Sequence, residues 1–279
     1  MFTGDTMKLA LCIGINDYPG VSNDLYGCRN DAADWTAALS ARGFDVRTLL
    51  DSAASGTAIR TGIADLLSRA ATGDAVVITY SGHGTWVPDL DGDEPDNRDE
   101  AICPHDVAAN GPLLDDELST LFSAADPGVR TVLISDSCHS GTLARLSRPL
   151  GDDRCSSRFL APSTFLPPPA GLPAGLAAGL PAGLAAGSAV RGGARSRPRS
   201  AALLLSACRD TEYSYDATFS GRPNGAFTYV ALTALAELPP GATYRDWLRA
   251  IRAQLPSQNY PQTPALQASP AQLAWPLLA

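Results

Sequence analysis

Residues 75–84 (AVVITYSGHG) and 131–141 (TVLISDSCHSG) are the two stretches that decide the fold of this chain. Each begins as an apolar run rich in β-branched residues, which predicts a strand buried on both faces. Each run ends at small polar residues that include a histidine or a cysteine. Since ligands of open α/β sheets bind beyond the carboxyl ends of the strands, we expect His83 and Cys138 to lie at one site.

The rest of the chain alternates between strand and helix patterns. Further apolar runs predict strands at residues 8–16, 46–50 and 201–207. Apolar residues with helical spacing predict helices at 30–42, at 55–70, from 226 through 235 and, as the last helix, at about 244–255. This alternation predicts an α/β fold with a mostly parallel central sheet and helices on both faces.

A low-complexity insertion interrupts this pattern at about residues 145–200. It contains three consecutive prolines, an octapeptide LPAGLAAG that occurs twice, and several arginines. Prolines and glycines every few residues oppose a continuous helix or strand, so the sequence predicts a disordered or loosely tethered loop. We therefore predict a single domain over residues 1–279 with one long insertion.

The composition narrows the class of protein. With 279 residues and 45% hydrophobic content, the chain can bury a sizeable core. Its net charge of −8 argues against a nucleic-acid binder and favours cationic partners. Its six cysteines form no C-x-x-C pair, and the sequence shows no signal peptide and no membrane-spanning stretch. We expect a cytoplasmic monomer.

Cys138 and His83 suggest a thiol nucleophile and its base. A cysteine thiol has an ordinary pKa of about 8.5, so it needs a neighbouring base or cation to react as a thiolate at neutral pH. The alternative for Cys138 is a buried structural thiol, as most free cysteines are. His139 and His105 are alternative bases, but His139 directly follows Cys138, and adjacent side chains on an extended turn point apart.

Five short motifs together give the chain a resemblance to a known family. They are residues 28–32 (CRNDA), 80–84 (YSGHG), 99–104 (DEAICP), 136–141 (DSCHSG) and 225–228 (GAFT). With these motifs the chain resembles the caspase-like cysteine peptidases, and within them the metacaspases and their bacterial relatives. The resemblance implies a caspase-like three-layer fold and a cysteine-type endopeptidase that acts on proteins or peptides and needs no cofactor for its chemistry.

The resemblance also assigns the catalytic groups. Cys138 would be the nucleophile, and His83 would protonate the leaving amine and then activate water. The backbone N–H groups of Gly84 and Cys138 would form the oxyanion hole, where a glycine lets the backbone approach closely.

By the same resemblance, Asp31 and Asp136 would bind a basic P1 side chain, and Cys28 and Ser81 would complete the S1 pocket. The implied specificity is cleavage after Arg or Lys. The structural alternatives are an N-terminal helix cap for Asp31 and a turn-stabilising role for Asp136.

Calcium is a further expectation from the resemblance. Asp99, Asp115 and Asp116 match three acidic ligands of the metacaspase activating site. Where a fourth acid is common in that family, this chain has Arg145, whose charge would oppose a divalent cation. Calcium activation is therefore left open.

The basic insertion is a candidate substrate of the enzyme that contains it. A tethered basic segment near an acidic pocket has a high effective concentration, which favours cleavage in cis. The candidate sites are Arg191, Arg195, Arg197 and Arg199, with Arg154 and Arg158 as nearer alternatives. Two other functions remain: a pseudopeptidase scaffold, or a processing peptidase of narrow specificity in a defence or cell-death system.

Overall fold

The computed structural model describes residues 6–20, 24–89, 92, 97–139, 156–166 and 201–279. At its centre is a six-stranded sheet with the strand order β12-β9-β7-β3-β1-β2. All neighbouring pairs are parallel except β12 and β9. The strands are β1 (Lys8–Gly14), β2 (Asp45–Leu50), β3 (Ala75–Ser81), β7 (Arg130–Asp136), β9 (Leu203–Ser206) and β12 (Ala265–Gln267).

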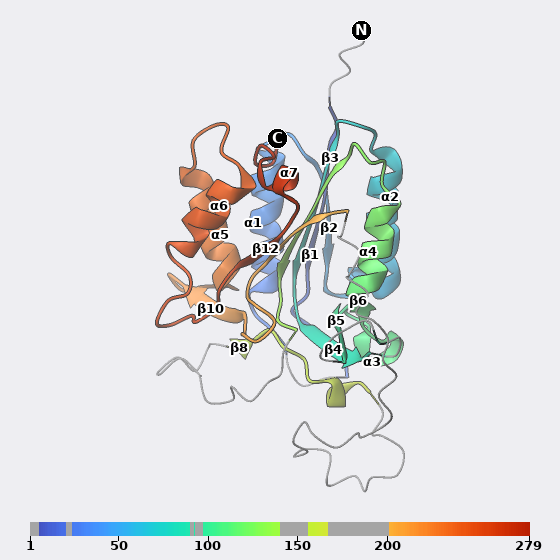
Figure 1. Ribbon diagram of the computed structural model, residues 1–279. Helices are drawn as coiled ribbons and strands as arrows, with labels where there is room; N and C mark the ends of the chain where they lie inside the picture. Colours follow the sequence, from blue (N-terminus) through green and yellow to red (C-terminus); the bar gives the residue numbers. More distant parts are fainter. Residues whose placement is uncertain (1–5, 21–23, 90–91, 93–96, 140–155, 167–200) are drawn as a thin grey trace, which may run out of the picture.

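Helices cover both faces of this sheet (Figure 1). On one face lie α1 (Cys28–Ser40), α5 (Ala226–Glu237) and α6 (Tyr244–Arg252), and on the other lie α2 (Gly56–Arg69) and α4 (Asp115–Ser123). The predicted α/β three-layer class with a mostly parallel sheet is confirmed.

The side chains of each central strand alternate between two hydrophobic clusters. In β1, Leu9 and Leu11 pack into the cluster under α2 and α4, whereas Ala10 and Cys12 pack into the cluster under α1, α5 and α6. All seven residues of β3 are buried, as expected for a strand covered on both faces. The core is thus divided by the sheet into two layers.

Two small sheets lie near the carboxyl ends of the central strands (Figure 1). One contains β4 (Gly84–Pro88), β5 (Arg98–Ile102) and β6 (Leu113–Leu114), and the other contains β8 (Ser156–Ser157), β10 (Tyr215–Phe219) and β11 (Arg222–Gly225). The remaining elements are η1 (Asp51–Ala53), α3 (Val107–Asn110), η2 (Pro162–Thr164) and α7 (Pro270–Leu273).

Two sequence predictions of local structure are wrong. Residues 156–166, placed in the loosely tethered insertion, instead form β8 and η2 and pack against the site. The helix expected at 244–255 ends at Arg252 and is followed by β12 and α7, so it is not the last helix. In both places long-range pairing outweighs the local sequence signal, since β8 pairs with β10 and β12 with β9.

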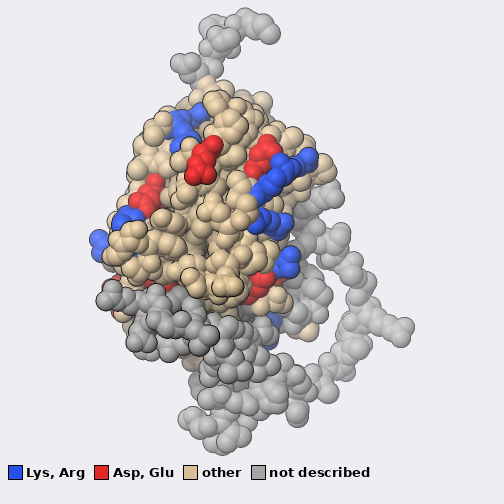
Figure 2. Space-filling model, turned by 90° about the vertical axis from the view of Figure 1, so that its left-hand side faces the viewer, with Lys and Arg blue, Asp and Glu red and all other residues tan. Residues whose placement is uncertain are grey.

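The charged residues on the described surface fit the acidic composition of the chain. On the side that faces the viewer in Figure 2, acidic and basic residues are interspersed among uncharged ones, and no broad basic surface is visible on the described part of it. None of the helices in the described segments has the length and hydropathy needed to span a membrane.

Buried and exposed residues of α2 allow a test of how this helix packs. Leu66 is 2% exposed in the hydrophobic cluster, and Thr61 on the same helix is exposed. We predict that Leu66→Ala lowers the free energy of unfolding by about 2–5 kcal/mol through lost burial and a residual cavity. Thr61→Ala should change it by less than about 0.5 kcal/mol. Denaturant unfolding of both variants measures the difference, and equal effects would contradict the packing of this helix.

Candidate active site

His83 and Cys138 follow neighbouring strands at equivalent positions. In the parallel pair β3 and β7, Ser81 lies opposite Asp136, and each of the two candidates comes two residues later. Both side chains are buried, with His83 1% and Cys138 0% exposed. The sheet therefore brings the two candidates to one edge, as the strand pattern predicted.

A tyrosine pair fixes the turn that carries His83. The Tyr18 hydroxyl accepts a hydrogen bond of 2.8 Å from the backbone N–H of His83, and the two rings lie 4.8 Å apart. The Tyr80 hydroxyl donates to the carbonyl of His83 at 2.7 Å. The backbone N–H of Cys103 donates to the same carbonyl at 2.9 Å. These bonds hold the histidine at the end of β3 before any substrate arrives.

Two backbone N–H groups converge on one carbonyl oxygen. Gly84 and Cys138 donate hydrogen bonds of 2.9 and 3.2 Å to the carbonyl of Arg158. A Cβ atom on residue 84 would overlap the backbone of Cys138, so only glycine allows this approach. These are the groups expected to form the oxyanion hole, and here they hold the carbonyl of a peptide bond.

The side chain of Arg158 occupies an acidic pocket. Its guanidinium lies 2.6 Å from Asp31, 3.1 Å from Asp136 and 3.0 Å from Asp216, and none of it is exposed. Asp31 and Asp136 are the residues expected in the S1 pocket. Asp216, on β10, was not expected, because no apolar run or motif marks this short strand.

Other parts of the protein hold the three carboxylates in place. Asp31 accepts hydrogen bonds from the backbone N–H of Gly225 and from the side chain of Asn224. Asp136 accepts hydrogen bonds from the backbone N–H and hydroxyl of Thr228 and from the hydroxyl of Ser214. Asp216 accepts hydrogen bonds from the backbone N–H groups of Tyr26 and Gly27. The pocket is thus anchored by the fold as well as by the arginine.

Charge and burial compete in this pocket. Burial raises the pKa of Asp31 to about 6, while the Arg158 charge opposes the rise and the Asp136 charge adds to it. For Arg158, burial favours the neutral form, but the surrounding carboxylates outweigh it and raise the pKa well above the usual value. The carboxylates of the pocket therefore keep the guanidinium of Arg158 charged.

The two structural alternatives for the acids do not describe their contacts. Gly27, and not Asp31, precedes α1 at the capping position, and Asp31 is fully buried in the first turn. Asp136 is the last residue of β7 and bonds to α5 through Thr228.

The other two expected S1 residues lie close by. Cys28 is buried at the start of α1. Burial raises the pKa of its thiol well above the usual value, and the charge of Arg158 opposes this rise. Ser81 is buried at the end of β3, opposite Asp136.

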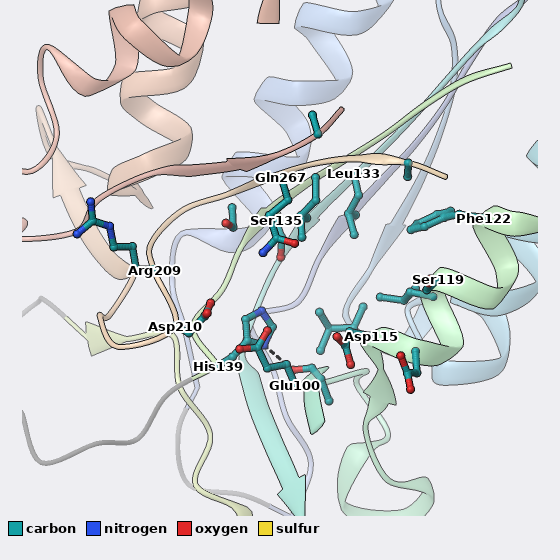
Figure 3. Close-up of a pocket in the computed structure, with 18 of the residues that line it drawn as sticks. Glu100, Asp115, Ser119, Phe122, Leu133, Ser135, His139, Arg209, Asp210 and Gln267 are labelled. Carbon is teal, nitrogen blue, oxygen red and sulfur yellow. Dashed lines mark hydrogen bonds between the residues drawn. The ribbon is translucent and has the colours of Figure 1, made fainter. Parts of the chain in front are cut away.

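The alternative histidines lie elsewhere. The Nδ1 atom of His139 is 3.1 Å from the carbonyl of Ala101, and its ring lines a separate cavity of about 300 Å³ (Figure 3). His105 is 3.9 Å from Asp17.

The expected calcium ligands lie beside that cavity. Asp115 and Asp116, in the first turn of α4, line it together with Glu100 (Figure 3), whereas Asp99 is on β5 and is not among its lining residues. In the described part of the chain, no three acidic, histidine or cysteine side chains converge as a metal site. Calcium binding by Asp99, Asp115 and Asp116 stays a prediction.

Several of the residues expected in the site or in the cleavable loop lie outside the described part of the chain. Arg145 and the candidate cleavage sites Arg154, Arg191, Arg195, Arg197 and Arg199 lie outside the described residues. Among the cleavage candidates, Arg158 alone is described, and it occupies the site itself.

Comparisons with known proteins identify relatives of this chain. The chain is 34% identical over 292 residues to metacaspase-1 of Cryptococcus neoformans, with 94% of this chain and 62% of the relative covered. It is 33% identical to metacaspase-1B of Neosartorya fischeri, covering 98% of this chain and 71% of that one. The chain thus spans less than two thirds of the first relative.

A solved structure and a family model complete the picture. The fold matches the crystal structure of a Geobacter sulfurreducens protein with a TM-score of 0.69 and 28% identity, covering 96% of both chains. The model of the caspase domain matches residues 7–274, which confirms the resemblance drawn from the motifs. By this match and by its metacaspase relatives, the chain belongs to the caspase-domain family of peptidases.

Proposed function

We propose that this chain is a cysteine endopeptidase that cleaves peptide bonds after arginine or lysine. One observation carries the proposal: Arg158 lies in the site as a P1 residue would, with its side chain among three carboxylates and its carbonyl on two backbone N–H groups. Membership in the caspase-domain family supports the same chemistry.

The chemistry is acyl transfer through a thioester. The Cys138 sulfur attacks the P1 carbonyl carbon, and the negative charge that develops on the oxygen is stabilised by the N–H groups of Gly84 and Cys138. His83 gives a proton to the departing amine, and the acyl group stays on sulfur. His83 then takes a proton from water, which releases the acid and restores the thiol.

Specificity for a basic side chain follows from the pocket. Three buried carboxylates facing one guanidinium leave an excess of negative charge, which a neutral or acidic P1 side chain would not compensate. A P1 aspartate would add a fourth negative charge to the same site. The pocket thus favours Arg or Lys and opposes Asp.

The chain around Arg158 runs through the site as an extended substrate. On its amino side, β8 pairs with β10, and the N–H of Arg158 donates to the carbonyl of Ser214 at 3.0 Å. On its carboxyl side, the N–H of Leu160 donates to the carbonyl of Gly84 at 2.9 Å, and Leu160 is fully buried. We therefore propose self-processing at the Arg158–Phe159 bond.

Regulation and setting remain proposals of the same kind. Calcium stimulation would require Asp99, Asp115 and Asp116 to converge, and their attachment to β5 and the start of α4 is compatible with such a rearrangement. A cytoplasmic, monomeric enzyme whose substrates include its own basic loop fits the charge and cysteine content.

The nucleophile is tested with short fluorogenic peptides. We expect wild-type protein to cleave peptides with P1 Arg or Lys and not P1 Asp, and Cys138→Ala to lose about 10³-fold or more of kcat/KM, since the attacking atom is removed. Cys12→Ala, at a buried thiol of β1 away from the site, is the control. Equal activity of the Cys138→Ala and wild-type proteins would sink the catalytic assignment.

The acidic pocket gives a pH test. With a cation in the pocket the pKa of Asp31 is about 6, so its carboxyl group is ionised above pH 6. Without the cation this pKa would be higher, and the carboxyl group would keep its proton to a higher pH. Binding therefore weakens as pH falls toward 6, because the pocket must first lose a proton, and the dependence levels off below that. We expect KM for an Arg peptide to rise accordingly in wild type and to be higher and flatter in Asp31→Asn. The same slope in both would remove Asp31 from specificity.

Self-processing predicts one defined nick. Incubated wild-type protein should yield fragments 1–158 and 159–279, the second beginning Phe-Leu-Ala-Pro, as measured by intact mass and N-terminal sequencing. Arg158→Lys should still be cut, whereas Arg158→Gln and Cys138→Ala should stay intact at this bond. Circular dichroism shows whether Arg158→Gln folds despite its unpaired carboxylates. A nick only after an arginine at 191–199 would make residue 158 an occupant of the pocket and not the processing site.

A further inference from the structure

A second thiol lies beside the proposed nucleophile. Cys208, just beyond β9, is 5% exposed, and its sulfur lies 3.7 Å from the carbonyl of Ser137, the residue directly before Cys138. The Cys138 sulfur also accepts a hydrogen bond of 2.8 Å from the N–H of Ser214. The acyl-transfer steps described above do not use Cys208.

The strand register places Cys208 next to the segment that carries Cys138. In the parallel pair β7 and β9, Ser135 lies opposite Ser206, and the N–H of Ala207 continues the ladder by donating to Ser135. Extending this register by two residues sets Cys208 beside Ser137, one residue before Cys138. Neighbouring strands are about 5 Å apart. Cys138 is one residue further along its strand, so its Cα atom lies diagonally from that of Cys208 at about 6 Å. Disulfides join residues whose Cα atoms are about 4.4–6.8 Å apart, so this spacing suits a bond.

The environment of Cys208 keeps it protonated. The neighbouring Cys138 and burial raise the pKa of Cys208 well above the usual value. Cys208 therefore stays a thiol, and its acceptors are the carbonyls of Ser137 and Glu212. A thiolate is the form of a cysteine that peroxides oxidise.

From this geometry we infer that Cys208 is the resolving cysteine of Cys138, so that a hydroperoxide converts the pair into an intramolecular disulfide and switches the enzyme off reversibly. The inference rests on the proposed role of Cys138 as the reactive thiol. The disulfide would remove the nucleophile, and it would also protect that sulfur from irreversible oxidation.

The reaction proceeds in two balanced steps. The Cys138 thiolate attacks the peroxide O–O bond, taking one oxygen as a sulfenic acid while the other leaves as hydroxide or alkoxide. The Cys208 sulfur then attacks the Cys138 sulfur, the S–S bond forms, and the displaced hydroxide takes the Cys208 proton and leaves as water. Two thiol reductants or one dithiol reverse the change.

The cavity of about 300 Å³ offers an approach for small solutes. Cys208 is among its lining residues, together with Ser135 and His139, whereas Cys138 is not and lies under the segment that carries Arg158. The described cysteines other than this pair, Cys12, Cys28 and Cys103, do not line it. Cys208 is thus the described thiol between this cavity and the nucleophile.

The test uses the full chain and hydrogen peroxide. Tryptic peptides 131–145 and 200–209 each contain one cysteine, so a mass equal to their sum minus two hydrogens identifies the disulfide after alkylation of free thiols. We expect this cross-linked pair in wild type and in Cys12→Ala. In Cys208→Ser we expect sulfinic or sulfonic acid on Cys138. After oxidation, treatment with dithiothreitol should recover a fraction of the peptidase activity that is at least about tenfold larger in wild type than in Cys208→Ser. Each fraction is taken relative to the activity of the same protein before oxidation.

The outcomes separate this inference from the proposed function. Oxidised wild type without the cross-linked pair, or with Cys138 joined to another cysteine, would overturn the resolving role even if the reduced enzyme cleaves Arg peptides. A cross-linked pair in a protein that cleaves no peptide when reduced would leave the thiol pair intact and overturn the peptidase proposal. Equal recovery of activity in wild type and Cys208→Ser would also contradict the protective role.

Discussion

The buried ion cluster of Arg158 with Asp31, Asp136 and Asp216 is the interaction on which the rest of the site depends. It joins four separate parts of the chain: the first turn of α1, the end of β7, strand β10 and the segment that crosses the site. Such a cluster is costly to desolvate and is held only where further hydrogen bonds satisfy the carboxylates. The fold supplies those bonds from Gly225, Thr228 and the loop before α1.

An excess of carboxylates over cations is poor design for stability alone. Burial raises the pKa of Asp31 to about 6 and the charge of Asp136 adds to the rise, so the charge of Arg158 does not fully compensate the buried carboxylate. The surplus negative charge supports the proposed preference of this site for a cationic side chain. The close packing of Gly225 against Asp136 and Arg158 leaves no room for a side chain there, so the backbone itself forms a wall of the pocket.

The same sheet edge places two sulfurs and one imidazole under different constraints. His83 is fixed through its backbone by Tyr18 and Tyr80, and Cys138 through its backbone N–H and the N–H of Ser214. Cys208 reaches the site from the next strand because β9 runs parallel to β7. The β3–β7 register therefore sets His83 level with Cys138, and the β7–β9 register sets Cys208 level with Ser137.

The α/β class, the central strands and the placement of His83 and Cys138 at one sheet edge could be predicted from the sequence alone. Buried parallel strands appear as continuous apolar runs, and their carboxyl ends share one edge. The family motifs also indicated Asp31 and Asp136. The remaining features required the three-dimensional structure. Asp216 and Cys208 lie outside every recognised motif, and residues 156–166 gain their order from pairing with β10 and from the charge of the pocket. Those contacts join residues far apart in the chain, so no local pattern encodes them.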